Sequence, residues 1–346
     1  SQSSNSSWLE KIQFNGDAQL DLNAFSYEKK LSNLDTKLNF KIAINKGIGQ
    51  ANLTPDSLIQ LSSADLAWLT QSGLPLALSK DIAKGGTLRF SQARQNQLSQ
   101  INWKLQSNHI DIATQFFASL RFAQTRADFM SSGQLELKVN QSQAVQPTFA
   151  LKDLTLKIFD VNAPTLKIEQ LLLSGAAHGA VDSWNGNFTL STKIDRIDLG
   201  TLTAHKMLIT IPMKASAQGD SWNIALAQPG QIQLNLSDNT KQFSIKHPLR
   251  LAITQLAFDG KQSNDDFSIK HQVDATLSPF SVWLTSQSAP IEVTIHPGKF
   301  ALSGQLNKDQ PYQAEGKWSG ATALLPQSQI KLENIAAAIS LGTKKR

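Results

Sequence analysis

The chain has 346 residues, of which 40% are hydrophobic and 17% are charged. A typical soluble domain carries about 25% charged residues, so the polarity of this chain comes largely from Ser, Gln, Asn and Thr. Its length is sufficient to bury a sizeable core, and its composition excludes a disordered tail. With no cysteine, the chain can form no disulfide scaffold, thiolate zinc site or cysteine nucleophile.

The net charge is +6, from 33 Lys and Arg against 27 Asp and Glu, and the isoelectric point is about 9.3. Such a balance permits attraction to an anionic membrane surface or to nucleic acid. The basic residues are scattered singly, and their only cluster is Lys344-Lys345-Arg346. A nucleic-acid interface requires a clustered basic face, so we predict no nucleic-acid partner.

The chain begins with residues 1–7, a Ser- and Asn-rich stretch that predicts a flexible polar lead-in. This stretch contains no initiator Met and no charged or apolar leader, so we expect that a targeting or anchoring segment is missing. No linker or shift in composition interrupts the remainder, which predicts one elongated β domain over residues 8–346. The longest apolar run, residues 335–339, is far too short to span a bilayer as a helix.

Strict alternation of apolar and polar residues dominates the chain and predicts strands with one wet and one dry face. The pattern is clear in residues 34–44 and returns at 135–139, 154–158, 232–236 and 267–270. Because only one face of each strand is apolar, the strands are of the antiparallel type. Glycine-containing turn sequences separate them at short intervals, which predicts about 18 to 22 strands.

One segment predicts a helix. It follows Ser62, and Asp65 lies three residues later at the spacing of a capping box. A glycine and a proline at positions 73 and 75 end the segment. Thr54-Pro55-Asp56 is able to open a further helical turn, and a strand over residues 57–61 fits nearly as well. We therefore predict one or two short helices in an otherwise all-β chain.

The reactive side chains show no pattern typical of a catalytic or metal site. None of the six histidines lies at a spacing typical of metal ligands. Asp195 and Asp198 lie at an odd offset within one strand, so their carboxylates point to opposite faces. The sequence contains no nucleophile elbow, phosphate-binding loop or dinucleotide fingerprint. We therefore predict no catalytic residue, no metal, no cofactor and no enzymatic activity.

The chain contains seven tryptophans but only two tyrosines. Aromatic rings of this number are able to stack on sugars or bases. A carbohydrate-active protein also needs paired acids beside an aromatic cleft, and the sequence shows no such pair. We interpret the tryptophans as covers for the edges or ends of an apolar surface.

A sheet of this many half-apolar strands must close as a barrel, fold into a sandwich or curl into a groove. An aliphatic groove that protein does not fill suits acyl chains, because burying them contributes roughly 0.8 kcal/mol per methylene. The candidate lipid-contacting positions are the apolar residues that alternate along the clearest strands. They are Leu38, Phe40, Ile42, Leu135, Leu137, Leu154, Leu156, Ile158, Ile232, Leu234, Leu236, Phe267 and Ile269. If the sheet closes on itself, the same residues belong to the hydrophobic core of the protein and do not contact lipid.

Several segments resemble a family of envelope proteins. They are Ala64-Asp65-Leu66-Ala67-Trp68-Leu69 with Leu74-Pro75-Leu76, Gly85-Gly86-Thr87-Leu88-Arg89-Phe90, and the stretch from Gly316-Lys317-Trp318-Ser319-Gly320 to Ile330-Lys331-Leu332-Glu333-Asn334-Ile335. Together they resemble the AsmA-like proteins of Gram-negative bacteria, of the YdbH and TamB kind. The resemblance lies in the general residue pattern over most of the chain and not in a single motif.

The resemblance implies an elongated, strongly curved antiparallel sheet that forms a taco-like hydrophobic groove. It also implies a non-enzymatic periplasmic conduit that moves phospholipid between the inner and outer membranes and contacts the acyl chains. The full-length protein would then be anchored in the inner membrane by an N-terminal helix that this chain lacks. Unpaired edge strands would allow an outer-membrane partner, or missing segments of the same protein, to add strands.

A structural or adhesive β-solenoid with a filled core at the cell surface is the alternative. Short repeated sequences favour this solenoid weakly. One example is the pentapeptide Phe243-Ser244-Ile245-Lys246-His247, which returns as Phe267-Ser268-Ile269-Lys270-His271. A solenoid normally shows stricter repeats of about 20 to 30 residues.

Overall fold

The computed structural model describes most of the chain. The described residues are 11–27, 30–71, 76–90, 99–106, 108–139, 146–180, 182–262, 267–286, 290–307 and 310–342. The predicted lead-in at residues 1–7 lies outside them. The chain forms two compact units, Ser1–Val181 and Asp182–Arg346, which are described separately. That the chain forms one domain from residue 8 onward stays a prediction.

The described residues contain 22 strands and two short helices, and every strand pairing within the two units is antiparallel. The prediction of an all-β antiparallel fold with one or two short helices is therefore confirmed.

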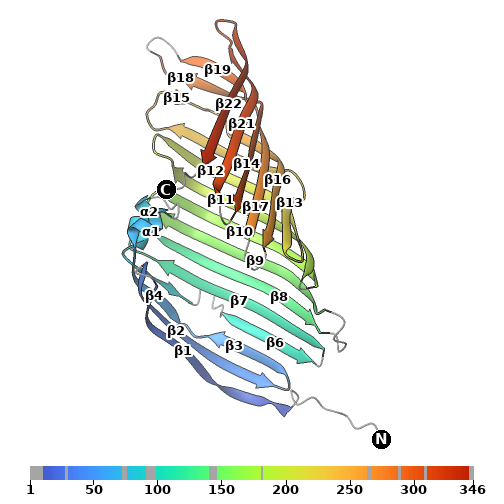
Figure 1. Ribbon diagram of the computed structural model, residues 1–346. Coiled ribbons are helices and arrows are strands. Elements are labelled where there is room, and N and C mark those ends of the chain that lie inside the picture. Colours follow the sequence, from blue (N-terminus) through green and yellow to red (C-terminus); the bar gives the residue numbers. More distant parts are fainter. Residues whose placement is uncertain are drawn as a thin grey trace. The chain divides into compact units, whose positions relative to one another are not determined.

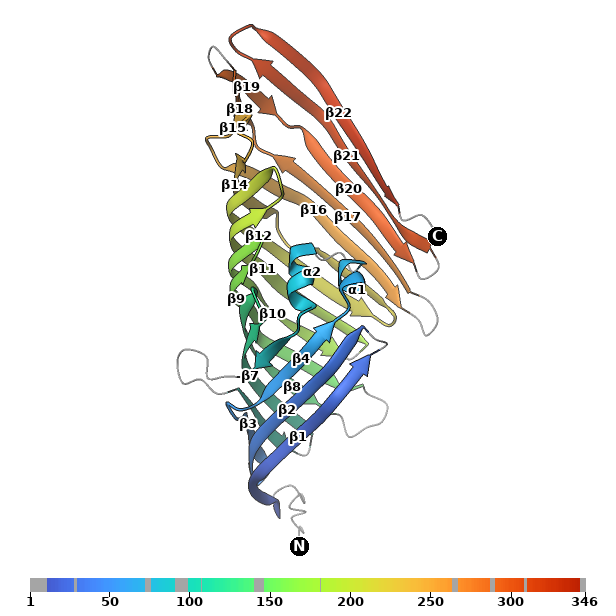
Figure 2. The same ribbon diagram turned by 90° about the vertical axis from the view of Figure 1, so that its left-hand side faces the viewer.

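The first unit is a meander of eight rows of strand, two of which are interrupted. In spatial order the rows are β1 (Gln13–Tyr27), β2 (Leu31–Asn45), β3 (Ile48–Leu53) with β4 (Leu58–Ala64), β6 (Gln100–Gln106) with β5 (Gly86–Arg89), β7 (His109–Arg121), β8 (Arg126–Lys138), β9 (Thr148–Ala163) and β10 (Leu166–Ala180). Figure 1 shows β6 to β9 side by side, and in Figure 2 the sheet of this unit bends so that β1 and β2 lie in front of β8.

The second unit repeats this plan of eight rows, and four of its rows are interrupted. They are β11 (Ser183–Asp198), β12 (Leu202–Gln218), β13 (Ser221–Leu226) with β14 (Gly230–Asp238), β16 (Leu249–Gln262) with β15 (Phe243–Ser244), β17 (Phe267–Leu277) with β18 (Phe280–Leu284), β20 (Lys299–Asn307) with β19 (Ile291–His296), β21 (Gln310–Leu325) and β22 (Ile330–Gly342).

Three interruptions of the second unit lie next to one another and form a line that we call the crease. It comprises Ser278-Pro279 between β17 and β18, Pro297-Gly298 between β19 and β20, and Gly320 within β21. Proline has no N–H to donate to a neighbouring strand, so it interrupts the ladder. Gly298 and Gly320 have φ angles of 66° and 72°, a left-handed conformation that glycine adopts without steric cost. The sheet is therefore bent at the crease by the backbone chemistry of these residues.

Two helices, α1 (Leu66–Gln71) and α2 (Leu76–Ile82), are inserted between β4 and β5 (Figure 2). Asp65 itself caps α1, because its Oδ1 accepts a hydrogen bond from the Trp68 N–H at 2.6 Å. The prediction of a capping box starting at Ser62 was therefore wrong in register, since Ser62 and Ser63 belong to β4. Segment 54–61 forms a turn followed by the start of β4, and positions 73 and 75 lie outside the described residues.

The sheets bury little apolar surface. The protein exposes 21843 Å² of accessible surface, whereas two compact globular proteins of half its mass would together expose about 17,000 Å². Within the described segments, the buried apolar side chains are few and most of them are alanines. The two units are thus built as sheets, not as sandwiches around a thick core.

We predict that Gly298→Ala lowers the free energy of unfolding by about 3 kcal/mol. A Cβ at this position would lie 2.1 Å from the Ser319 carbonyl oxygen, and the φ of 66° is itself unfavourable for alanine. Urea unfolding followed by tryptophan fluorescence measures the effect. Gly316→Ala is the control, because a Cβ there makes only ordinary contacts, from 3.8 Å outward, and a change of no more than about 1 kcal/mol is expected. Equal losses in both variants would contradict this account of the crease.

Candidate functional site

The register of the first unit joins apolar residues into rows that cross the whole sheet. One row of directly opposed residues reads Phe14, Ile44, Gly49, Trp103, Ile112, Leu135, Leu151 and Ala177. Directly opposed residues in antiparallel strands project from the same face. One face of this unit is therefore apolar from β1 to β10.

The neighbouring row of the same strands projects from the other face and is mostly polar. From β2 to β8 it reads Asn45, Ile48, Lys104, Asp111 and Glu136. The alternation seen along each strand is thus kept in register between strands. This separation gives the sheet one apolar and one polar face.

The second unit shows the same separation. An apolar row reads Trp184, Ala217, Trp222, Gly260, Ile269 and Leu306. The adjacent row on the opposite face reads Ser183, Gln218, Ser221, Lys261, Ser268 and Asn307, without one apolar residue. Each unit therefore presents its own apolar face.

All thirteen candidate positions from the sequence lie on the apolar face of their unit. Leu38, Phe40, Ile42, Leu135, Leu137, Leu154, Leu156 and Ile158 share the face of the first unit, and Ile232, Leu234, Leu236, Phe267 and Ile269 that of the second. None of them is buried: Leu156 is 41% exposed and the others are half-buried. Within each unit the structure thus places these residues on one face of the sheet. Their contact with lipid stays a prediction.

Two tryptophans lie flat on the apolar faces where the opposing strand has a glycine. Trp103 is opposite Gly49, and Trp222 is opposite Gly260. A Cβ at either glycine would lie within 2.1 Å of an indole carbon, so only glycine leaves room for the ring. The sequence contains these residues, but their pairing joins positions that are 54 and 38 residues apart, which periodicity does not reveal.

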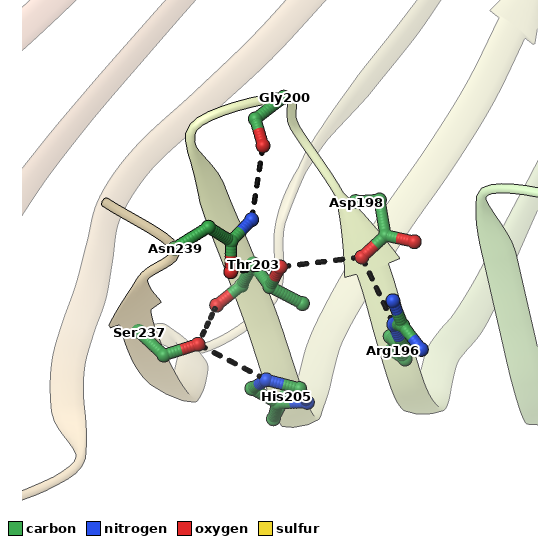
Figure 3. Close-up of polar contacts among 7 residues, drawn as sticks. All are labelled: Arg196, Asp198, Gly200, Thr203, His205, Ser237 and Asn239. Carbon is green, nitrogen blue, oxygen red and sulfur yellow. Dashed lines mark hydrogen bonds and ion pairs between the residues drawn. The ribbon is translucent and has the colours of Figure 1, made fainter. Parts of the chain in front are cut away.

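A polar cluster joins the strand ends of β11, β12 and β14 (Figure 3). Asp198 accepts hydrogen bonds from Arg196 Nε at 2.9 Å and from Thr203 Oγ1 at 3.2 Å, and the Arg196 bond is the main cause of a lowered pKa at Asp198. Asn239 Nδ2 donates to the Gly200 carbonyl at 2.9 Å. These bonds connect two turns that are far apart in the sequence.

His205 and Ser237 are the pair in this cluster that most resembles a catalytic dyad. The His205 Nε2 to Ser237 Oγ distance is 3.1 Å, and the same hydroxyl donates to the Thr203 carbonyl at 3.3 Å (Figure 3). The neighbouring carboxylate of Asp198 accepts hydrogen bonds from Arg196 and Thr203. Figure 3 shows no hydrogen bond between this carboxylate and the imidazole of His205. The arrangement therefore acts as a link between β12 and β14.

Asp238 organises the turn that follows β14. Its Oδ1 accepts from the Thr240 N–H at 2.8 Å and from the Thr240 hydroxyl at 2.6 Å, and its Oδ2 accepts from the Gln242 N–H at 2.7 Å and the Phe243 N–H at 3.1 Å. These donors, led by the Thr240 hydroxyl, hold the pKa of Asp238 below its usual range, because hydrogen bonds to a carboxylate favour its charged form.

In the part of the chain that the structure describes, no group of three or more His, Asp or Glu side chains is placed to hold a metal ion. Neither described helix has the length and apolarity needed to cross a membrane. Comparisons with protein-family models, with curated proteins and with solved structures find no match for this chain.

We predict that Asp238→Asn lowers the melting temperature at pH 7 by about 2 °C, because the amide cannot accept as strongly as the carboxylate. A carboxyl group whose pKa is lower in the folded state stabilises the fold above its unfolded pKa and loses this effect as the pH falls. The difference between wild type and variant should therefore shrink towards about pH 3. Calorimetry across this range measures it, and a difference that stays constant with pH would contradict the assigned role.

Proposed function

We propose that this chain is a non-enzymatic lipid conduit whose apolar sheet faces carry the acyl chains of phospholipid. The observation that carries the proposal is the set of exposed apolar side chains on the described sheet of each unit. In the first unit Phe14, Leu20 and Leu22 are 49%, 56% and 44% exposed. Large exposed apolar patches on soluble proteins mark interaction sites for apolar partners.

The apolar face suits the acyl chains of a phospholipid and leaves its head group in water. Burying acyl methylenes against Leu, Ile and Phe contributes about 0.8 kcal/mol per methylene. An apolar row such as that from Ile44 to Leu135 offers a head group no charged side chain, so the head group stays in water. Movement along the face breaks no covalent bond and needs no reactive residue.

The resemblance to AsmA-like proteins supports a location for this activity. By that resemblance we propose a periplasmic protein that works between the inner and outer membranes and is anchored in the inner membrane in its full-length form. Among the described strands, β1 pairs only with β2, and β22 pairs only with β21. Each strand therefore has an edge that is available for strand addition by a partner at the outer membrane.

A structural or adhesive β-solenoid remains the second candidate. It requires a tightly filled interior, whereas the thirteen alternating positions are half-buried or exposed. The pairing within each unit is also that of an antiparallel meander rather than of stacked coils. These observations support the conduit over the solenoid as the proposal to test first.

We predict that photo-crosslinkers on the apolar face label phospholipid several-fold more than crosslinkers on the polar face. A photoreactive amino acid is placed at Leu135 or at its neighbour Gln134 in the first unit, and at Leu234 or Gln233 in the second. The purified chain is mixed with vesicles of phosphatidylethanolamine and phosphatidylglycerol, irradiated, and scored for covalent lipid by mass spectrometry. Each pair of neighbours lies on one strand and differs in face, which makes each polar position a matched control.

Equal labelling from both faces would indicate adventitious contact and would contradict the conduit. No labelling from either face, together with a lipid-free mass in native mass spectrometry, would favour the solenoid.

A further inference from the structure

A cavity opens on the apolar face of the second unit at the crease. A hollow of about 520 Å³ opens there, within the range of about 300–1,000 Å³ typical of small-molecule sites. Its walls are side chains of Leu251, Leu277, Phe280, Ile295, Phe300 and Trp318. They come from neighbouring rows, so the site is built by the bend in the sheet and not by one strand.

Among the residues that the structure describes, the lining contains no charged or polar side chain apart from the indole of Trp318. The Trp318 Nε1–H donates to the Pro297 carbonyl oxygen, in the crease itself. This bond satisfies the indole donor and holds the ring at the cavity wall. A ligand in this site therefore meets apolar groups and aromatic carbon.

Two small residues set the depth of the cavity. Gly316 and Ala337 belong to β21 and β22 and face the cavity beside Trp318 and Ile339. The nearest atoms to a Cβ at Gly316 would be 3.8–3.9 Å away, so a larger side chain fits there and would occupy the cavity. Ile339 is 63% exposed, which leaves the site open to solvent on the apolar face.

We propose that this cavity, which we call the crease pocket, is a defined binding site for a single acyl chain on the apolar face. The proposal rests on the proposed function and adds a defined site to it. The pocket reaches from β16 to β22, five rows of strand, which corresponds to about 19 Å at the usual strand spacing. An elongated site with an apolar lining of this kind matches one extended hydrocarbon chain. Lys299 and Lys317 alternate with the wall residues Phe300 and Trp318 and project from the opposite face, so these two cations point away from the pocket.

The test uses palmitic acid carrying a diazirine group, with labelled peptides mapped by mass spectrometry on the full chain. In the wild type we expect the label to concentrate on peptides from β19 to β22. Gly316→Leu fills the floor of the pocket and is expected to reduce labelling of these peptides about tenfold or more. Ala301→Leu is the matched control, because it adds the same side chain on the opposite face of β20, where Ala301 is exposed. It should leave labelling of these peptides unchanged.

A second variant, Ala337→Phe, fills the same space from β22, where Ala337 is exposed, and should repeat the loss. Circular dichroism confirms that each variant is folded. If lipid labels the apolar faces but Gly316→Leu and Ala337→Phe leave its distribution unchanged, the crease pocket is wrong and the conduit stands. If no face takes up lipid, both proposals fail. If light scattering shows a dimer of the wild type that Gly316→Leu and Ala337→Phe convert to a monomer, a second copy covers the pocket and the acyl-chain site is also overturned.

Discussion

The structure depends on one constraint, which is that side chains alternate between the two faces of a strand with a period of two. A slip of one residue between neighbouring strands would place an apolar residue beside a polar one on every row. The rows from Phe14 to Ala177 and from Trp184 to Leu306 show that the register is kept across many strands. An apolar face as wide as a whole unit follows from this one condition.

The interruptions of the strands matter as much as their continuity. A flat sheet offers an apolar surface but no cavity, and proline and left-handed residues provide the local bends. Bulge positions with positive φ occur in both units, among them Asp153, Asp160 and Lys206. In the second unit neighbouring breaks coincide at the crease, and the bend there converts part of the surface into a pocket.

Polar chemistry in the second unit serves mainly to hold turns and strand ends in place. Asp238 gathers the donors of one turn, and Asn239 and Thr203 connect that turn to the one after β11. Fixing the turns fixes the register of the strands they join, and the register produces the apolar face. The polar clusters and the proposed lipid surface are thus parts of one arrangement.

The sequence by itself determined which segments form strands and which side of each strand is apolar. Residues such as Leu135, Leu137 and Leu234 could be assigned to one face because the alternation is local and needs no knowledge of neighbours. The position of the α1 cap was predicted three residues too early, and α2 was not recognised as a separate helix. Both helices are short, and short helices give weak periodic signals.

Only the tertiary structure decided which strands pair, which glycines lie beneath tryptophan rings and which breaks coincide. Gly49 and Trp103, or Pro297 and Trp318, are far apart in the chain, and no local pattern links them. Pairing is set by the summed contacts of whole strands, so these partnerships appear only when the sheet is assembled. The apolar faces could therefore be predicted from the sequence, whereas the crease pocket became visible only in the fold.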